Sequence, residues 1–234
     1  MTALTPTKDT GGRTKPMPGV YVEPSQQMTE EVLLEFLPDA GMNAPYMADF
    51  LSGMLAHERC GRHLYRTCET RSHNPMLQRK YQEFGRETER HVQILEDLIT
   101  VAGGHPGYVS PTARAVQGSD TKLVESTFAL AGGLDLMTAE MAMLDAVFLA
   151  ESMDHANWKL LRRLTKEMDH GMLRNRFQEA VDEVEDQEDE HLEWATKTKE
   201  RLVTMQAKSS MTAKMGEKAE EFVARIRGWL SDDS

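Results

Sequence analysis

The sequence predicts an all-α protein in which four long helices form a bundle, with short helices near both ends of the chain. Two observations lead to this prediction. All nine prolines lie at or before Pro111, so no proline interrupts long helices after that point. Apolar residues also recur at spacings of three and four along four separate segments, which is the pattern of a helix with one buried face.

Composition restricts the class of protein. With 234 residues, the chain is long enough for one sizeable domain with terminal tails. The net charge of −11 argues against nucleic acid or an anionic membrane surface as a partner. The first residues lack the apolar stretch of a secretion signal, and no uncharged apolar run is long enough to cross a bilayer. We therefore expect a cytoplasmic protein without membrane insertion.

Two segments precede the predicted bundle. Residues 1–27 are rich in Thr, Gly, Pro and Lys, and this composition predicts a disordered tail. Residues 28–46 are predicted to hold a short amphipathic helix, over 29–37, and a linker. Cys60 and Cys68, on the first bundle helix, are separated by about 12 Å at ~1.5 Å per residue, so we expect two reduced thiols.

The bundle is predicted for residues 47–207, beginning with a hairpin of two helices. The first helix covers about 47–71 and the second ends near 102. Between them, Asn74 is a suitable N-cap and Pro75 suits the first helical position. The segment 103–120 then shows no periodic pattern, and we interpret it as an extended crossover that reaches about 60 Å at ~3.3 Å per residue.

The second hairpin and the end of the chain complete the predicted fold. The two helices of the second hairpin cover about 134–168 and 172–205. The sequence is also compatible with a further helical segment ahead of Gly132. Residues 208–234 are predicted to contain an amphipathic helix over 217–230, with its apolar residues on one face. We expect this helix to dock on the bundle or on a neighbouring subunit, and we expect a homo-oligomer.

Glu188 and His191 interrupt the apolar face of the last bundle helix. A carboxylate and an imidazole on a buried face cost free energy unless something satisfies them. In four-helix bundles, a Glu and a His one turn apart that project inward are how a carboxylate-bridged pair of metal ions is held. The sequence therefore predicts a metal site, and the other helices must supply further ligands.

A pseudo-repeat locates those ligands. At an offset of one hundred residues, the apolar stripe of the second helix matches that of the fourth, and His91 is equivalent to His191. Glu58 interrupts the apolar stripe of the first helix, and Glu151 interrupts that of the third. Counted from the turn of its hairpin, each Glu lies at about the same height as the His of that hairpin. Thr88 takes the position that corresponds to Glu188.

The order Glu, Glu-x-x-His, Glu, Glu-x-x-His over residues 47–205, with a long crossover after the second helix, resembles the ferritin-like superfamily. The stretch RETERHVQILEDL is also similar to a helix of small stress-induced bacterial ferritin-like proteins. The resemblance implies a carboxylate-bridged di-iron site with five ligands in family positions: Glu58, His91, Glu151, Glu188 and His191. The chain departs from the family at Thr88, where a bridging Glu is expected. Glu87, about 100° around the helix, is included as a sixth candidate ligand.

Mixed carboxylate and imidazole ligands favour Fe, Mn or Zn over Ca²⁺. The resemblance implies two iron ions, or an Fe/Mn pair, in an oxidoreductase that acts on Fe²⁺, O₂ or peroxide in iron handling or oxidative-stress defence. The alternative is a structural or interaction bundle with a degenerate or absent metal site, and Thr88 supports it. If Glu87 does not bind, the five remaining ligands hold one ion, a solvent-bridged pair, or none.

Other side chains near the predicted site have ordinary interpretations. Tyr65 and Trp158 each follow a hairpin's Glu by seven residues and are expected in the core, where either is placed to relay electrons near a metal. His155 is equally compatible with a supporting role and with simple packing. The remaining histidines are interpreted as core or surface residues without a ligand role: His57, His63, His73, His105 and His170.

Overall fold

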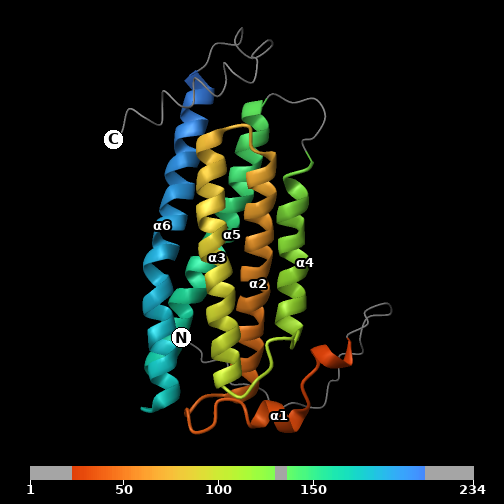
Figure 1. Cartoon of the computed structure of the whole chain (residues 1–234), viewed down its shortest axis with the longest axis vertical. Coiled ribbons are helices and arrows are strands. Elements are labelled where there is room, and N and C mark those ends of the chain that lie inside the picture. The colour runs from red at the N-terminus through yellow and green to blue at the C-terminus, as the bar shows by residue number, and fades with distance from the viewer. Residues whose placement is uncertain (1–22, 130–135, 209–234) are drawn as a thin grey trace, which may run out of the picture.

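The computed structural model describes residues 23–129 and 136–208, and every regular element in these residues is helical. The prediction of an all-α protein is therefore confirmed for the described part. The elements are η1 (Pro24–Gln26), α1 (Glu30–Leu34), α2 (Ala44–Arg71), α3 (Pro75–Val101), α4 (Pro111–Ser126), α5 (Leu136–Glu167) and α6 (Met172–Lys208). The long helices run side by side along the axis of the molecule (Figure 1). Residues 1–22 and the helix predicted over 217–230 lie outside the described residues.

Local capping explains where the first long helices begin. Asn43 accepts a hydrogen bond from the backbone N–H of Tyr46, so α2 starts at Ala44, slightly before the predicted residue 47. Asn74 caps α3 in the same way through the N–H of Met76, and Pro75 is the first helical residue, as predicted. α2 and α3 form an antiparallel hairpin, and α5 and α6 form a second one.

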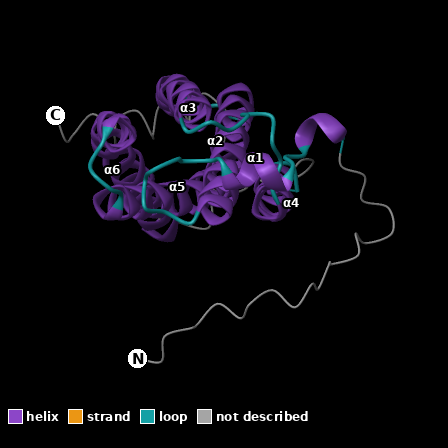
Figure 2. Cartoon of the chain, turned by 90° about the horizontal axis from the view of Figure 1, so that it is seen from below, coloured by secondary structure: helices purple, strands orange, loops and turns teal. Residues whose placement is uncertain are grey.

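The prediction of an extended crossover between the two hairpins was wrong, because most of this segment belongs to the helix α4. Ser110 caps this helix by accepting from the N–H of Ala113, and α4 packs on α2 and α5. Figure 2 shows it at the outer side of the bundle. Its fully buried positions are Ala113 and Asp120, with Thr127 just after the end of the helix. These side chains are small or polar, and the apolar Leu123 and Val124 are only partly buried against the core, so the apolar stripe of this helix is short.

A buried ion pair fixes α4 to its neighbours. His57 Nδ1 on α2 is 2.7 Å from Asp120 Oδ2 on α4, and His57 Nε2 is 3.0 Å from the carbonyl oxygen of Ala150 on α5. Burial by itself lowers the pKa of His57, but the hydrogen bond and charge of Asp120, with the Ala150 carbonyl, outweigh burial and raise this pKa to about 9. His57 is therefore a cation that joins three helices.

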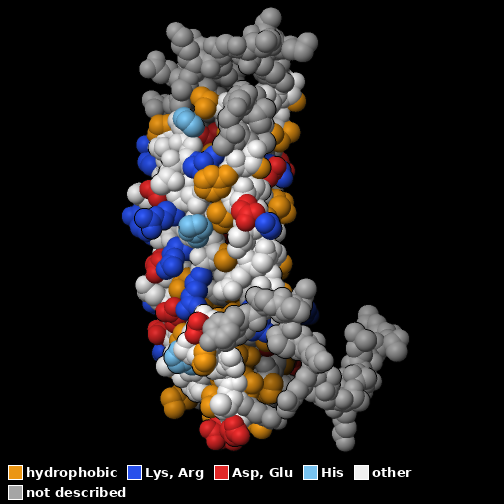
Figure 3. All heavy atoms as spheres, turned by 90° about the vertical axis from the view of Figure 1, so that its right-hand side faces the viewer, with side chains coloured by type: hydrophobic (Ala, Val, Ile, Leu, Met, Phe, Trp, Pro, Cys, Tyr) orange, Lys and Arg blue, Asp and Glu red, His pale blue; other side chains and the backbone are white. Residues whose placement is uncertain are grey.

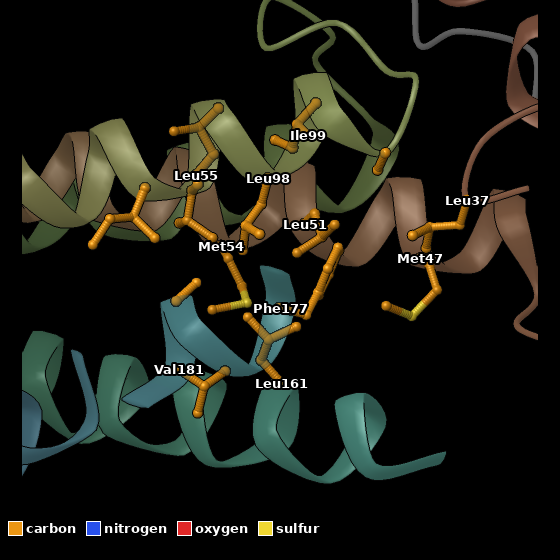
Figure 4. Close-up of a cluster of buried hydrophobic side chains, with 14 of the residues drawn as sticks. Leu37, Met47, Leu51, Met54, Leu55, Leu98, Ile99, Leu161, Phe177 and Val181 are labelled. Carbon is orange, nitrogen blue, oxygen red and sulfur yellow. The ribbon is translucent and has the colours of Figure 1, made fainter. Parts of the chain in front are cut away.

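Apolar side chains fill the bundle on either side of its middle. Near one end, side chains from four helices point toward one another, among them Leu51, Leu98, Leu161 and Phe177 (Figure 4). Toward the other end, a second group includes Tyr65 and its neighbours on α3 and α5. The polar side chains predicted as ligands lie between these two groups along their helices. The core therefore encloses them in apolar surroundings.

The surface carries charges of both signs. On the face shown in Figure 3, Lys and Arg side chains are interspersed with Asp and Glu. Among the described residues, no helix is long and apolar enough to span a membrane. Cys60 and Cys68 are both free thiols, as the spacing predicted.

Candidate metal centre

Five predicted ligand side chains from four helices meet in the middle of the bundle. Each is at most 3% exposed. They form two overlapping groups that share one carboxylate: Glu58, His91 and Glu188 make one group, and Glu151, Glu188 and His191 make the other. Within each group, the candidate ligand atoms all lie within 4.8 Å of one another. Buried Glu and His groups that could hold a metal ion are thus present where the pseudo-repeat placed them.

The distances put Glu188 at the centre. Its Oε1 lies 3.0 Å from His91 Nδ1 and 3.8 Å from His191 Nδ1. His91 Nδ1 is also 3.6 Å from Glu58 Oε1, and His191 Nδ1 is 3.3 Å from Glu151 Oε2. The two imidazole rings are 5.9 Å apart between centroids. One carboxylate therefore faces both imidazoles, which is the position a bridging ligand needs.

Each of these five side chains has a buried polar atom without a hydrogen bond. Despite the close contacts, one buried atom of each residue has no hydrogen-bond partner within the described part of the chain: Glu58 Oε2, His91 Nδ1, Glu151 Oε2, Glu188 Oε2 and His191 Nδ1. Buried polar atoms without partners cost about 1–3 kcal/mol each, so their convergence needs an explanation. A bound cation is one that suits carboxylate oxygens and imidazole nitrogens together.

The outward nitrogen of each imidazole is held by the opposite hairpin. His91 Nε2 is 2.8 Å from Gln187 Oε1, and His191 Nε2 is 2.7 Å from Glu87 Oε2. Because an amide oxygen and a carboxylate only accept, each Nε2 carries the proton, which leaves Nδ1 directed inward. Such a contact fixes the orientation of a metal-binding imidazole. The two supporting residues obey the same offset of one hundred, a signal in the sequence that identifies Gln187 once Glu87 is chosen.

Glu87 lies on the outer side of His191 and belongs to neither ligand group. Its side chain is one-third exposed, unlike those of the five buried residues. Glu87 as a metal ligand therefore stays a prediction, and what the structure shows is a carboxylate that orients His191. The exposed position also places Glu87 between the site and solvent.

Two aromatic residues each donate a hydrogen bond to a candidate ligand carboxylate. The Tyr65 hydroxyl on α2 donates to Glu151 Oε1 at 2.8 Å, and Trp158 Nε1 on α5 donates to Glu58 Oε1 at 2.7 Å. Each aromatic residue thus binds the carboxylate of the facing helix. Both are core residues, as predicted, and Oε2 of each Glu has no hydrogen-bond partner among the described residues.

The sequence did not single out Asp154, which also belongs to this region. It lies one turn after Glu151 and is 4% exposed. Burial, followed by the nearby charges of Glu58 and Glu188, raises its pKa well above the ordinary value. Its Oδ1 has no hydrogen-bond partner among the described residues. The spacing of three after Glu151, on the buried stripe, was the available signal.

The neighbouring carboxylates raise the pKa of both imidazoles. Burial lowers the pKa of His191, but Glu151 and Glu87 outweigh it and raise this pKa to about 9. The pKa of His91 is also raised well above its usual range, because Glu58 and Glu188 outweigh the effect of burial. Burial raises the pKa of Glu188 to about 7. A metal ion bound to Nδ1 must displace a proton from each imidazole.

Two other residues near the site do not offer a ligand atom in this structure. The Thr88 hydroxyl donates to the carbonyl oxygen of Phe84 at 2.9 Å within its own helix. His155 Nδ1 lies 3.1 Å from the half-exposed Asp189, away from the buried groups. The donor set of buried carboxylates and imidazoles therefore fits Fe, Mn or Zn, and it does not fit an all-oxygen Ca²⁺ site.

No family model matches this chain, and neither the curated proteins nor the solved structures contain a match.

Proposed function

We propose that this chain is a ferritin-like protein that binds a pair of metal ions, two Fe or Fe and Mn, and acts as an oxidoreductase on Fe²⁺, O₂ or peroxide in iron handling or oxidative-stress defence. One observation carries the proposal. Buried atoms without partners converge from four helices on Glu188, and they are the donor types that such a metal pair uses. Without a metal, the same groups are held to one another by buried ion pairs between the imidazoles and the carboxylates.

The proposed roles follow from the contacts. Glu188 faces both imidazoles and would bridge the ions, with Glu58 and His91 on one side and Glu151 and His191 on the other. When bound, the metal pair supplies the one-electron steps that O₂ and peroxide require. Phe84 lies against the His191 ring, at 4.1 Å between centroids, and helps to exclude water. Glu87 and Gln187 orient the imidazoles.

The rival proposal is a structural or interaction bundle that has lost its metal pair. The internal hydrogen bond of Thr88 favours it, because the family's bridging position on this helix then offers no carboxylate. The two proposals differ in one cheap measurement, the metal content of the purified protein.

We expect purified protein to contain Fe or Mn, and we expect a chelator to lower its melting temperature. A ligand that binds only the native state stabilises it by about 2.7 kcal/mol at a hundredfold excess over Kd. The measurement is elemental analysis, followed by thermal unfolding with and without chelator. Glu188→Ala is the control, because its melting temperature should not respond to chelator. Protein that takes up neither Fe nor Mn, and whose melting temperature is the same with and without chelator, would support the metal-free bundle.

Glu87→Gln should weaken metal binding about tenfold without changing the number of ions. The amide oxygen still accepts from His191 Nε2, but the negative charge that makes the imidazole a better donor is gone. Titration with Mn²⁺ measures the affinity. Glu89→Gln is the matched control, because Glu89 is exposed on the same helix and pairs with Arg62. Loss of one ion in Glu87→Gln would instead identify Glu87 as a ligand, and an affinity equal to the control would remove its orienting role.

A further inference from the structure

We propose that Asp154 is a metal ligand of this site and that it supplies the carboxylate that is missing at Thr88. This inference rests on the proposed function, since it assumes that the buried groups bind metal. It goes beyond the family pattern, in which the third helix contributes a single Glu. The proposal concerns the half of the site formed by Glu58 and His91.

The position of Asp154 is the first argument. It projects from α5 one turn after Glu151 and is almost fully buried. Its pKa is raised by burial and by the charges of Glu58, Glu188 and Glu151, so its carboxyl group is in the electrostatic field of the site, although it belongs to neither group of ligand atoms within 4.8 Å of one another. Its Oδ1 has no hydrogen-bond partner in the described part of the chain, like one atom of each of the five other candidate ligands.

The pseudo-repeat supplies the second argument. Gly61 follows Glu58 by three residues, just as Asp154 follows Glu151. In the first hairpin this position has no side chain, and a Cβ built on Gly61 would meet the Thr88 methyl group at 3.6 Å. The first hairpin thus places Gly61 against Thr88 where the second has two acids, Asp154 and Glu188. With Asp154 as a ligand, the site has as many carboxylates as it would have with a Glu at position 88.

Charge is the third argument. Two divalent ions bring four positive charges into a core that is closed by apolar side chains on both sides. The three buried Glu residues supply three negative charges, and Glu87 supplies a fourth beside His191, whereas His91 has the neutral Gln187 in that place. The half of the site formed by Glu58 and His91 is therefore the one that lacks a negative charge, which is costly in apolar surroundings. An ionised Asp154 would supply it, because the carboxyl groups of Asp154 and Glu58 interact.

Asp154→Asn tests the proposal, because the amide has the shape of the carboxyl group without its charge. Co²⁺ titration, followed by visible absorption and by the metal retained after gel filtration, gives the stoichiometry. We expect two ions in the wild type, and we expect Asp154→Asn to lose one ion or to bind it at least tenfold more weakly. Glu140→Gln is the control, because Glu140 is a buried acid of the same helix that binds Ser72 and His73 outside the site. It should retain both ions.

The double variant Thr88→Glu/Asp154→Asn gives a second, independent result. It moves the sixth carboxylate back to the position equivalent to Glu188, and we expect it to recover the second ion. A folded double variant that binds one ion would overturn the proposal even if Asp154→Asn alone failed to fold, as judged by circular dichroism.

Different results would contradict metal binding by the site and the ligand role of Asp154. Wild-type protein that binds no Co²⁺, Mn²⁺ or Fe²⁺ overturns the proposed function. Wild-type protein whose ions, one or two, are bound as tightly after Asp154→Asn overturns only the role of Asp154. Equal losses in Asp154→Asn and Glu140→Gln also overturn it, because the effect would then be a general one of removing a buried acid from α5.

Discussion

Glu188→Ala should abolish binding of both metal ions and leave a folded helical protein. Glu188 is the one residue that both ligand groups contain, and its Oε1 lies near both imidazole nitrogens. Its removal takes a ligand from each ion at once. It also removes the cost of burying a carboxylate whose pKa burial raises to about 7, and Glu58 still pairs with His91, so the protein should stay folded. His191→Ala should weaken the binding of one ion more than that of the other, because His191 belongs to only one of the two ligand groups.

Metal retained after gel filtration measures this effect, with far-ultraviolet circular dichroism to confirm the fold. Glu190→Ala is the matched control, because Glu190 lies on the same helix but is exposed and pairs with Lys80. Its metal content should equal that of the wild type. Full metal occupancy in Glu188→Ala would remove the bridging role and, with it, the proposed site.

Asp120→Asn should destabilise the protein by about 3–5 kcal/mol, the usual loss when one partner of a buried ion pair is removed. His57 is 2% exposed, and both of its nitrogens are engaged, so the cation has no other partner to turn to. The loss should detach α4 from α2 and α5. Denaturant unfolding in the presence of chelator measures it without a contribution from metal. Glu125→Gln, an exposed acid of the same helix, is the control and should change little.

The same pair predicts a pH dependence. The pKa of His57 is about 9 in the folded protein, above its ordinary value of 6.5. A group whose pKa is raised by folding stabilises the protein fully below the unfolded pKa and loses this effect as pH rises through the folded pKa. The difference in stability between the wild type and Asp120→Asn should therefore be largest below pH 6.5 and should shrink toward pH 9. A difference that stays constant over this range would show that charge does not hold α4.

Helix periodicity predicted much of the fold because long helices with one apolar face leave a regular pattern in the sequence. The bounds of α3 and α6 follow from that pattern together with Asn74, Pro75 and the turn before Met172. α4 escaped prediction because its fully buried positions, Ala113 and Asp120, are small or polar, and its apolar Leu123 and Val124 are only partly buried. The energy that holds it includes an ion pair with His57, and no residue near α4 in the sequence reveals this partner.

The sequence by itself determined which residues could meet. Glu58, His91, Glu151, Glu188 and His191 share inward stripes at matching heights, because a helix fixes the direction and rise of every side chain along it. Only the tertiary structure decided how they meet. Whether Glu87 points in or out, that Gln187 holds His91, and that Asp154 joins the buried carboxylates all depend on how one helix is rotated against another. Contacts between residues far apart in the chain set that rotation, and no local pattern encodes it.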